Sequence, residues 1–185
     1  SGGKGVGRVT GKVLTVENEI PIRSANVSVK GTTIEAITDS AGNYSINNIP
    51  VGSQTLQVDS IGYKSKTVTL NILAGTNEKD IFLETDISGV GTVGGKVIGV
   101  SANDEIIELG GANIQLFKEV GMPADYSLKT ADNGAYEFSE VESGTYMATT
   151  AYNGYLTNSK EAIVRSNGIT ILNFKLQLAR RLDFD

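Results

Sequence analysis

The side chains that could do chemistry in this sequence are carboxylates, because histidine and cysteine are both absent. Their absence removes thiol nucleophiles, disulfides, histidine general bases and almost every zinc site. Acidic residues cluster in NDEIIELG, with Asp104, Glu105 and Glu108, and in SEVES, with Glu140 and Glu142. A glycosidase needs two such groups at a fixed separation across a cleft. Both stretches are typical of solvated loops, so we expect no catalytic pair and no enzyme.

Oxygen is the only metal ligand left, and the candidate residues lie in two similar turns. Asp39 and Asn43 are in the first turn, and Asp132 and Asn133 in the second. A Ca²⁺ ion takes more converging oxygen ligands than these turns supply. Asp and Asn also favour turns because their side chains bond the nearby backbone. We therefore expect neither a metal nor a cofactor.

An aromatic pair in TAYNGYLTN is the candidate ligand platform. Exposed Tyr152 and Tyr155 would offer apolar faces to a sugar ring, and Asn153 and Asn158 would offer amides to its edge. The alternative is a packing role, because Tyr155 matches Tyr63 in an earlier part of the chain. We expect the packing role and keep the four residues as the possible binding site.

Composition describes a chain of many short strands. It has 185 residues, a length for one or two domains, with 39% hydrophobic residues and 22 glycines. The net charge is −5 and no basic face is evident, which argues against a nucleic-acid partner. No apolar run approaches the ~20 residues that a membrane-spanning helix requires, so we expect no membrane span in this segment.

An internal repeat divides the chain. Three pairs of blocks match in the same order: GRVTGKVLTV (7–16) with GTVGGKVIGV (91–100), AGNYSI (41–46) with NGAYEF (133–138), and IGYKS (61–65) with NGYLT (153–157). The extra residues of the second copy fall in SANDEIIELG and KEVGMPADYS, where loops are expected. Two copies of one domain are therefore predicted.

The repeat blocks set the domain boundaries. We expect a tag or linker at 1–6, one domain at 7–85, a linker at 86–90, a second domain at 91–178 and a tail at 179–185. A linker this short should restrict the relative motion of the two domains.

Alternation of apolar and polar residues predicts strands throughout. In AGNYSI, Gly42 takes the positive φ of a hairpin turn, and Tyr44 and Ile46 point inward on the next strand. NNIPVG then forms a corner that moves the chain to another strand. About seven such strands in each copy predict two tandem antiparallel β-sandwiches. The predicted core residues are Val27, Tyr44, Ile46, Ile49 and Leu56, with Ile114, Tyr136, Phe138, Val141 and Ala148 as their counterparts.

These motifs resemble a known family. The Gly-x-Val of the first strand, SANVSVKGTT, TDSAGNYSI, IPVGSQTLQV and SIGYKSKTVTL are similar to the carboxypeptidase-regulatory-like domain over nearly all of the first copy. The second copy keeps each block more loosely and is also similar to the collagen-adhesin B-type repeat. Both families share a transthyretin-like β-sandwich, usually of seven strands. The resemblance implies an accessory module of secreted or surface proteins rather than a catalytic domain.

The adhesin resemblance also suggests a covalent bond to test. Such repeats often join a first-strand Lys to a last-strand Asn in an amide that a buried Glu promotes. Lys96 and Asn173 occupy those strands, but Thr150 stands at the Glu position. The first copy has Val58 there and no Asn in DIFLET. We expect no amide, with Lys96 reaching solvent and Asn173 making ordinary hydrogen bonds.

Three functions are consistent with these expectations. The first is a non-catalytic spacer, stalk or adhesion segment of a larger bacterial cell-surface or secreted protein, with flanking modules as its partners. The second is a carbohydrate- or protein-binding module that uses the loops of the second copy. The third is an N-terminal extension of an outer-membrane receptor, against which the tandem second copy argues. The expected location is extracellular or at the cell surface.

Overall fold

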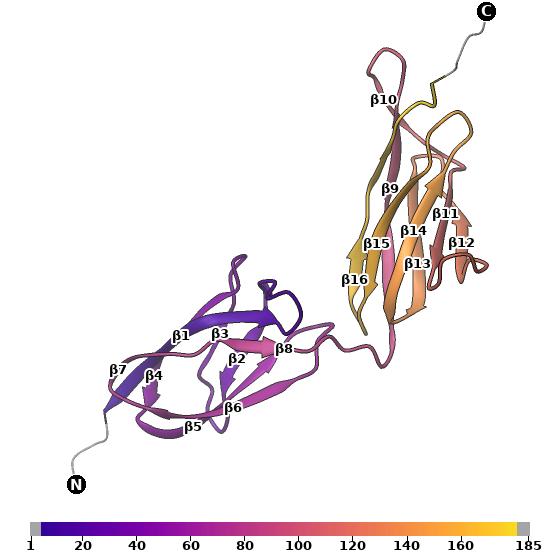
Figure 1. The fold of residues 1–185 in the computed structure, drawn as a ribbon. Coiled ribbons are helices and arrows are strands. Elements are labelled where there is room, and N and C mark those ends of the chain that lie inside the picture. Colours follow the sequence, from indigo (N-terminus) through magenta and orange to yellow (C-terminus); the bar gives the residue numbers. More distant parts are fainter. Residues whose placement is uncertain (1–4, 181–185) are drawn as a thin grey trace, which may run out of the picture. The chain divides into compact units, whose positions relative to one another are not determined.

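The computed structural model describes residues 5–180, and every regular element within them is a β-strand (Figure 1). Residues 1–4 of the expected leading segment and 181–185 of the expected tail lie outside the described residues. Contacts divide the chain into two compact units, Ser1–Asp86 (unit 1) and Ile87–Asp185 (unit 2). In the described part of the chain, no helix is long and apolar enough to cross a membrane.

Unit 1 is a sandwich of two sheets. Its strands are β1 (Val6–Thr15), β2 (Asn26–Val29), β3 (Glu35–Ile37), β4 (Asn43–Pro50), β5 (Gly52–Asp59), β6 (Lys66–Ile72), β7 (Gly75–Glu78) and β8 (Ile81–Leu83). One sheet has the order β4-β1-β7, with β8 also paired to β1, and the other has the order β3-β2-β5-β6. The chain therefore passes from one sheet to the other at the corner between β4 and β5, as NNIPVG predicts.

Unit 2 repeats this plan and adds one strand. Its strands are β9 (Val90–Val100), β10 (Ile106–Glu108), β11 (Asn113–Phe117), β12 (Tyr126–Lys129), β13 (Ala135–Glu142), β14 (Gly144–Ala151), β15 (Asn158–Val164), β16 (Ile169–Ile171) and β17 (Phe174–Leu176). The sheets are β10-β9-β13, with β16 and β17 also on β9, and β12-β11-β14-β15. The additional strand β10 comes from the first predicted insertion.

The all-β sandwich is confirmed, with two differences in detail. The first and last strands of each unit are parallel neighbours, whereas the other pairs are antiparallel. The last strand is also interrupted, so that β7 and β8 follow one another along β1, and β16 and β17 along β9. Unit 1 and unit 2 therefore divide into more strands than the seven expected for each copy.

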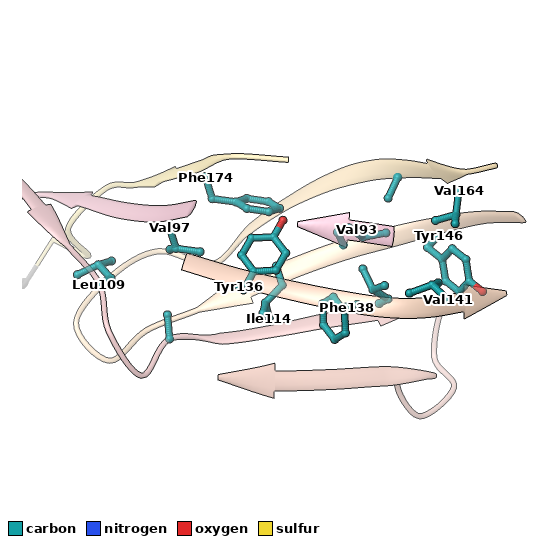
Figure 2. Close-up of a cluster of buried hydrophobic side chains, with 14 of the residues drawn as sticks. Val93, Val97, Leu109, Ile114, Tyr136, Phe138, Val141, Tyr146, Val164 and Phe174 are labelled. Carbon is teal, nitrogen blue, oxygen red and sulfur yellow. The ribbon is translucent and has the colours of Figure 1, made fainter. Parts of the chain in front are cut away.

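The predicted core positions are confirmed in both units. All of them are at most 7% exposed: Val27, Tyr44, Ile46, Ile49, Leu56, Ile114, Tyr136, Phe138, Val141 and Ala148. In unit 2, Val97, Tyr136 and Phe174 lie together toward one end of the cluster and Val141 and Tyr146 lie at the other (Figure 2). The tyrosines add edge-to-face ring contacts, such as Tyr136 with Phe138 at 6.0 Å between centroids.

A buried threonine repeats in the same place in each unit. The hydroxyl of Thr38 accepts a hydrogen bond from the Ala25 N–H at 2.8 Å and donates to a backbone carbonyl. Thr130 makes the same pair of bonds, with the Ala112 N–H at 2.9 Å. Each threonine hydroxyl bonds a backbone N–H and a backbone carbonyl that have no partner in a neighbouring strand. The two copies therefore share buried polar contacts as well as apolar core positions.

Candidate functional site

The parallel pairing of the first and last strands decides where the chain enters and leaves each unit. In unit 1, β1 pairs with β7 from Gly7↔Gly75 onward and with β8 up to Thr15↔Leu83. Figure 1 shows β1 and β8 side by side with their arrows in the same direction. In unit 2, β9 pairs in the same way with β16 and β17. Each unit therefore receives the chain at one end of its sandwich and releases it at the other.

Three features stabilise the break between β7 and β8 in unit 1. The Lys79 carbonyl approaches β1 so closely that a Cβ on Gly11 would lie 1.9 Å from its oxygen, so only glycine fits there. The Tyr44 hydroxyl donates to that same carbonyl at 2.5 Å. Next along the chain, the Asp80 Oδ1 accepts a hydrogen bond from the Lys12 backbone N–H at 2.8 Å, which a regular ladder would have satisfied.

Unit 2 reproduces this arrangement with one change. A Cβ on Gly95 would lie 1.9 Å from the Leu172 carbonyl oxygen, and the Tyr136 hydroxyl donates to that oxygen at 2.7 Å. The Oδ1 of Asn173, in place of an aspartate, accepts from the Lys96 backbone N–H at 2.9 Å. We call each glycine, tyrosine and carbonyl group a clamp: Gly11, Tyr44 and Lys79 in unit 1, and Gly95, Tyr136 and Leu172 in unit 2.

Burial of the clamp tyrosines changes their titration. Removal from water raises the pKa of the Tyr44 hydroxyl well above its ordinary value, and the nearby Asp80 carboxylate adds to this effect. Burial raises the pKa of Tyr136 in the same direction. Both hydroxyls therefore stay protonated and remain donors to the clamp carbonyls over a wide pH range.

Sequence reasoning assigned these tyrosines to the core and did not find their second role. The available signal was identity between the copies, because GKV and the tyrosine of the hairpin recur in both. Asp80 carried no such signal, since its counterpart Asn173 is a different residue. What joins the groups is the parallel last strand, which an alternating pattern does not reveal.

An open hollow lies beside each clamp. The hollow of unit 1 has a volume of about 600 Å³, and its charged lining residues are Lys12, Glu78, Lys79 and Asp80. The hollow of unit 2 has a volume of about 360 Å³ and is lined by Lys96, Ile98, Lys160, Asn173, Phe174 and Lys175. The two hollows share two equivalent positions, Lys12 with Lys96 and Asp80 with Asn173. Beyond these, the hollow of unit 1 extends to β4 and β7, whereas that of unit 2 extends to β15 and β17. Their charges differ: unit 1 mixes both signs, whereas unit 2 combines three lysines with an amide.

The rings of the predicted aromatic pair lie close together, but their planes are tilted relative to each other. Tyr152 and Tyr155 are half-buried, their ring centroids are 5.8 Å apart, and their planes meet at 60°. The Tyr155 ring packs over Gly99, where a Cβ would lie 2.6 Å from its Cε1 atom. Asn153 is exposed and Asn158 is half-buried at the start of β15. The packing contacts account for Tyr155, and sugar binding at these four residues stays a prediction.

The acidic clusters are largely on strands, which corrects the expectation of loops. Glu108 belongs to β10, and Glu140 and Glu142 belong to β13. The Glu140 backbone has a φ of 55° at a break in the β9–β13 register. Glu108 and Glu142 each pair with a lysine, Lys96 at 2.6 Å and Lys118 at 2.7 Å respectively.

Turn chemistry accounts for the predicted oxygen ligands. The Asp39 carboxylate accepts the Ala41 and Asn43 backbone N–H groups, and these bonds lower its pKa, the Asn43 contact being the largest cause. In unit 2 the Asn133 Oδ1 accepts the Ala135 N–H at 3.0 Å. Among residues 5–180, no group of three or more acidic side chains is placed to hold a metal.

The lysine and asparagine of the suggested amide make other contacts. The Lys96 Nζ lies 2.6 Å from a Glu108 carboxylate oxygen, and the Asn173 Oδ1 faces the Lys96 backbone N–H. Thr150, at the position of the promoting carboxylate, donates its hydroxyl proton to the Asn113 carbonyl. The arrangement pairs the ammonium group with an acid rather than with the amide, and the absence of the bond stays a prediction.

Two β-sandwich units with a closing parallel strand define an all-β modular protein. The model of the CarboxypepD_reg-like domain matches residues 9–93, which span unit 1 and the start of β9. Unit 1 is therefore similar to the CarboxypepD_reg-like domain, the family that its motifs resemble. A search of the curated proteins found no match to the chain.

Solved structures with similar folds include bacterial pilins. The minor pilin GBS52 of Streptococcus agalactiae is 14% identical, with a TM-score of 0.42 over 96% of this chain and 98% of that one. The shaft pilin spaA of Lactobacillus rhamnosus GG is 9% identical, with a TM-score of 0.40 over 96% and 100%. The Bacillus anthracis TIE protein is 19% identical, with a TM-score of 0.38, and the match covers 94% of this chain but 34% of that one.

Proposed function

We propose that this chain is a non-catalytic, load-bearing spacer segment of a larger bacterial surface or secreted protein. The observation that carries the proposal is the parallel pairing of first and last strands in both units. Tension on the two ends of a unit pulls these strands in opposite directions along their axes. The hydrogen bonds between them are then loaded together, whereas an unzipping geometry would break them one after another.

The clamps support this role because they close the ladder where it is interrupted. Between β7 and β8 the Asp80 side chain supplies the acceptor for the Lys12 N–H, and Tyr44 binds the displaced Lys79 carbonyl. The buried polar groups at the break thus keep their partners, which is what a strand under load requires. Unit 2 has the same protection, so neither unit is an evident weak point.

The segment that connects the two units has few residues between positions that are hydrogen-bonded within either unit. The Asp86 N–H donates to the Gly62 carbonyl within unit 1. The Gly89 N–H donates to the Ser166 hydroxyl, and its carbonyl accepts from Ser143, both within unit 2. Within the expected linker 86–90, the bonded positions Asp86 and Gly89 are thus three residues apart. A short connection would pass tension from one unit to the next.

Flanking modules of the parent protein are the partners that a spacer requires, and an extracellular or cell-surface location follows from the same proposal. The family of unit 1 supports a module role, since the resemblance implies an accessory domain. An N-terminal extension of a receptor would use the same fold, and no feature of the described residues favours it over a spacer.

Single-molecule force spectroscopy tests the proposal. The chain has no cysteine, so handles can be attached at introduced cysteines without side reactions. Pulling on the two chain ends should give two unfolding steps of similar length, one for each unit. Pulling between the N-terminus and a Pro50→Cys handle should need clearly less force, because Val6 and Pro50 are register neighbours of an antiparallel pair that peels open. Equal forces in the two geometries would refute a load-bearing role.

A further inference from the structure

At the position that the two hollows share beside the first-strand lysine, unit 2 has an asparagine where unit 1 has an aspartate. In both hollows the residue after the clamp carbonyl accepts the backbone N–H of a first-strand lysine, Asp80 from Lys12 and Asn173 from Lys96. A backbone N–H requires an oxygen acceptor, so this bond decides which end of the Asn173 amide faces it. The Nδ2 group is left to present two donors, whereas Asp80 presents a second carboxylate oxygen.

No partner for the Asn173 Nδ2 occurs among the hydrogen bonds of residues 5–180, so its donors are available to a ligand. The Asp80 Oδ2 likewise has no hydrogen-bond partner in the described part of unit 1. Asn173 therefore presents a fixed donor at the position where Asp80 presents a fixed acceptor.

Three lysines from three strands surround this donor. Lys96 (β9) is tied to Glu108 on β10 at 2.6 Å. The Lys160 Nζ (β15) donates to the Asn173 carbonyl and stands 5.1 Å from the centre of the Phe174 ring. Lys175 (β17) is exposed on the strand that pairs with β9. Such a gathering is notable in a chain with 16 basic against 21 acidic residues.

We propose that this hollow binds an acidic sugar, that is, a sugar unit carrying a carboxylate or a sulfate group. The three ammonium groups and the Asn173 amide would hold the oxyanion by charge-assisted hydrogen bonds. Glu108, which pairs with Lys96 beside the hollow, would accept hydrogen bonds from sugar hydroxyls. A volume of about 360 Å³ is at the small end of ligand sites and suits one or two sugar rings.

The Glu108 carboxylate beside the hollow favours a sugar over an acidic peptide as the ligand. A peptide rich in Asp and Glu would match the lysines but would place like charges against Glu108, with no hydroxyl groups to donate to it. A sugar acid brings both the anion and the hydroxyl donors. The proposal concerns unit 2 alone and does not depend on the load-bearing role.

Calorimetric titration of the full chain tests the site. The probes are polygalacturonate and dextran sulfate, with methyl-esterified polygalacturonate and plain dextran as their uncharged counterparts and poly-glutamate as the acidic peptide. We expect saturable binding of one or both charged polysaccharides that weakens as salt rises, and none of the uncharged forms. Which charged polymer binds tells a carboxylate site from a sulfate site.

Variants locate the binding. Asn173→Asp should weaken it about tenfold or more, because it installs the carboxylate of unit 1 while keeping the acceptor for the Lys96 N–H. Lys175→Gln should weaken it several-fold. The matched control is Lys129→Gln, on β12 and outside the hollow, which should leave affinity unchanged.

Three results would overturn the proposal. They are the absence of saturable binding to both charged polysaccharides, an equal loss of affinity in Lys129→Gln and Lys175→Gln, and binding of poly-glutamate as tight as that of the polysaccharides. Circular dichroism of each variant against the parent chain shows that the fold is retained, so a loss of binding can be assigned to the hollow.

Discussion

Unit 1 and unit 2 have the same residues where a side chain would meet a backbone carbonyl or bonds to the backbone, and they have different residues on the solvent-exposed surface. The shared positions are Gly11 and Gly95, Thr38 and Thr130, Gly42 and Gly134, and Tyr44 and Tyr136. Each of these either approaches a carbonyl too closely for a side chain or bonds to a backbone group at the edge of the core. The comparison shows that a duplicated sandwich preserves its backbone contacts together with its apolar pattern.

The differences lie on the outer face and in the hollow. Ile169 and Ile171 on β16 are 72% and 63% exposed, whereas Thr76 and Glu78 hold the equivalent places on β7. Asn173 replaces Asp80, and β10 is added beside β9. None of these changes alters a buried contact. Unit 2 therefore carries a different surface chemistry on the same sandwich.

The largest expected effect is loss of a clamp glycine. Gly11→Ala or Gly95→Ala would place a methyl group 1.9 Å from a backbone oxygen, which neither strand can avoid without losing its pairing. We expect each variant to destabilise its own unit by about 4 kcal/mol or more. Scanning calorimetry should show this loss. Gly5→Ala, which meets nothing within 4 Å, is the neutral control, and comparable loss in that control would contradict the explanation.

A core truncation gives the next largest effect. Phe138→Ala removes a ring that is 6% exposed and touches Tyr126 and Tyr136. The expected cost is about 3–5 kcal/mol in chemical denaturation of unit 2. Ser139→Ala, on the exposed side of the same strand, should change stability little. A loss below about 1 kcal/mol for Phe138→Ala would show that the ring contributes far less than its burial indicates.

Alkaline pH should weaken both units. The pKa values of Tyr44 and Tyr136 are raised in the fold above the ordinary 10.0, so the unfolded chain loses these protons first. Burial also raises the pKa of Tyr146 to about 12. The folded state then binds more protons than the unfolded state, and stability falls as pH rises above 10. Denaturation midpoints measured across this range check the sign, and a rising midpoint would contradict it.

The clamp hydroxyls can be removed singly to compare the units. Tyr44→Phe and Tyr136→Phe each leave a carbonyl without its tyrosine donor, which should cost about 1 kcal/mol. The alkaline loss of stability should also become shallower in the affected unit. A variant that kept the full alkaline slope would show that another group causes it.

The last prediction is that the intact mass of the chain equals the mass calculated from its sequence. The Lys96 ammonium pairs with Glu108, so we expect no amide with Asn173. Mass spectrometry should return the sequence mass for the full chain. A deficit of one ammonia would reveal an amide in unit 2, and a deficit of one water would reveal one between Lys12 and Asp80 in unit 1.

Much of the fold could be predicted because its signals are local. Alternation placed Tyr44 and Ile46 inward, and repeated blocks identified the second copy. The direction of the last strand has no such signal, since alternation is the same in parallel and antiparallel pairs. The hollow of unit 2 brings together Lys96 on β9, Lys160 on β15 and Asn173 between β16 and β17. In the sequence each of these is an ordinary polar residue, so only the topology reveals the site.

The parallel closing strand also affects the order of synthesis. In each unit the first strand pairs with residues far along the chain: Arg8 lies beside Thr76, which comes 68 positions later in the sequence. Until those residues leave the ribosome, one edge of β1 is open to any strand that fits it, and such distant pairing is slow. The closing strands of unit 2 resemble those of unit 1 and could pair with β1 instead. Because β7 and β8 precede all of unit 2 in the chain, vectorial synthesis lets the first sandwich close before its competitors exist.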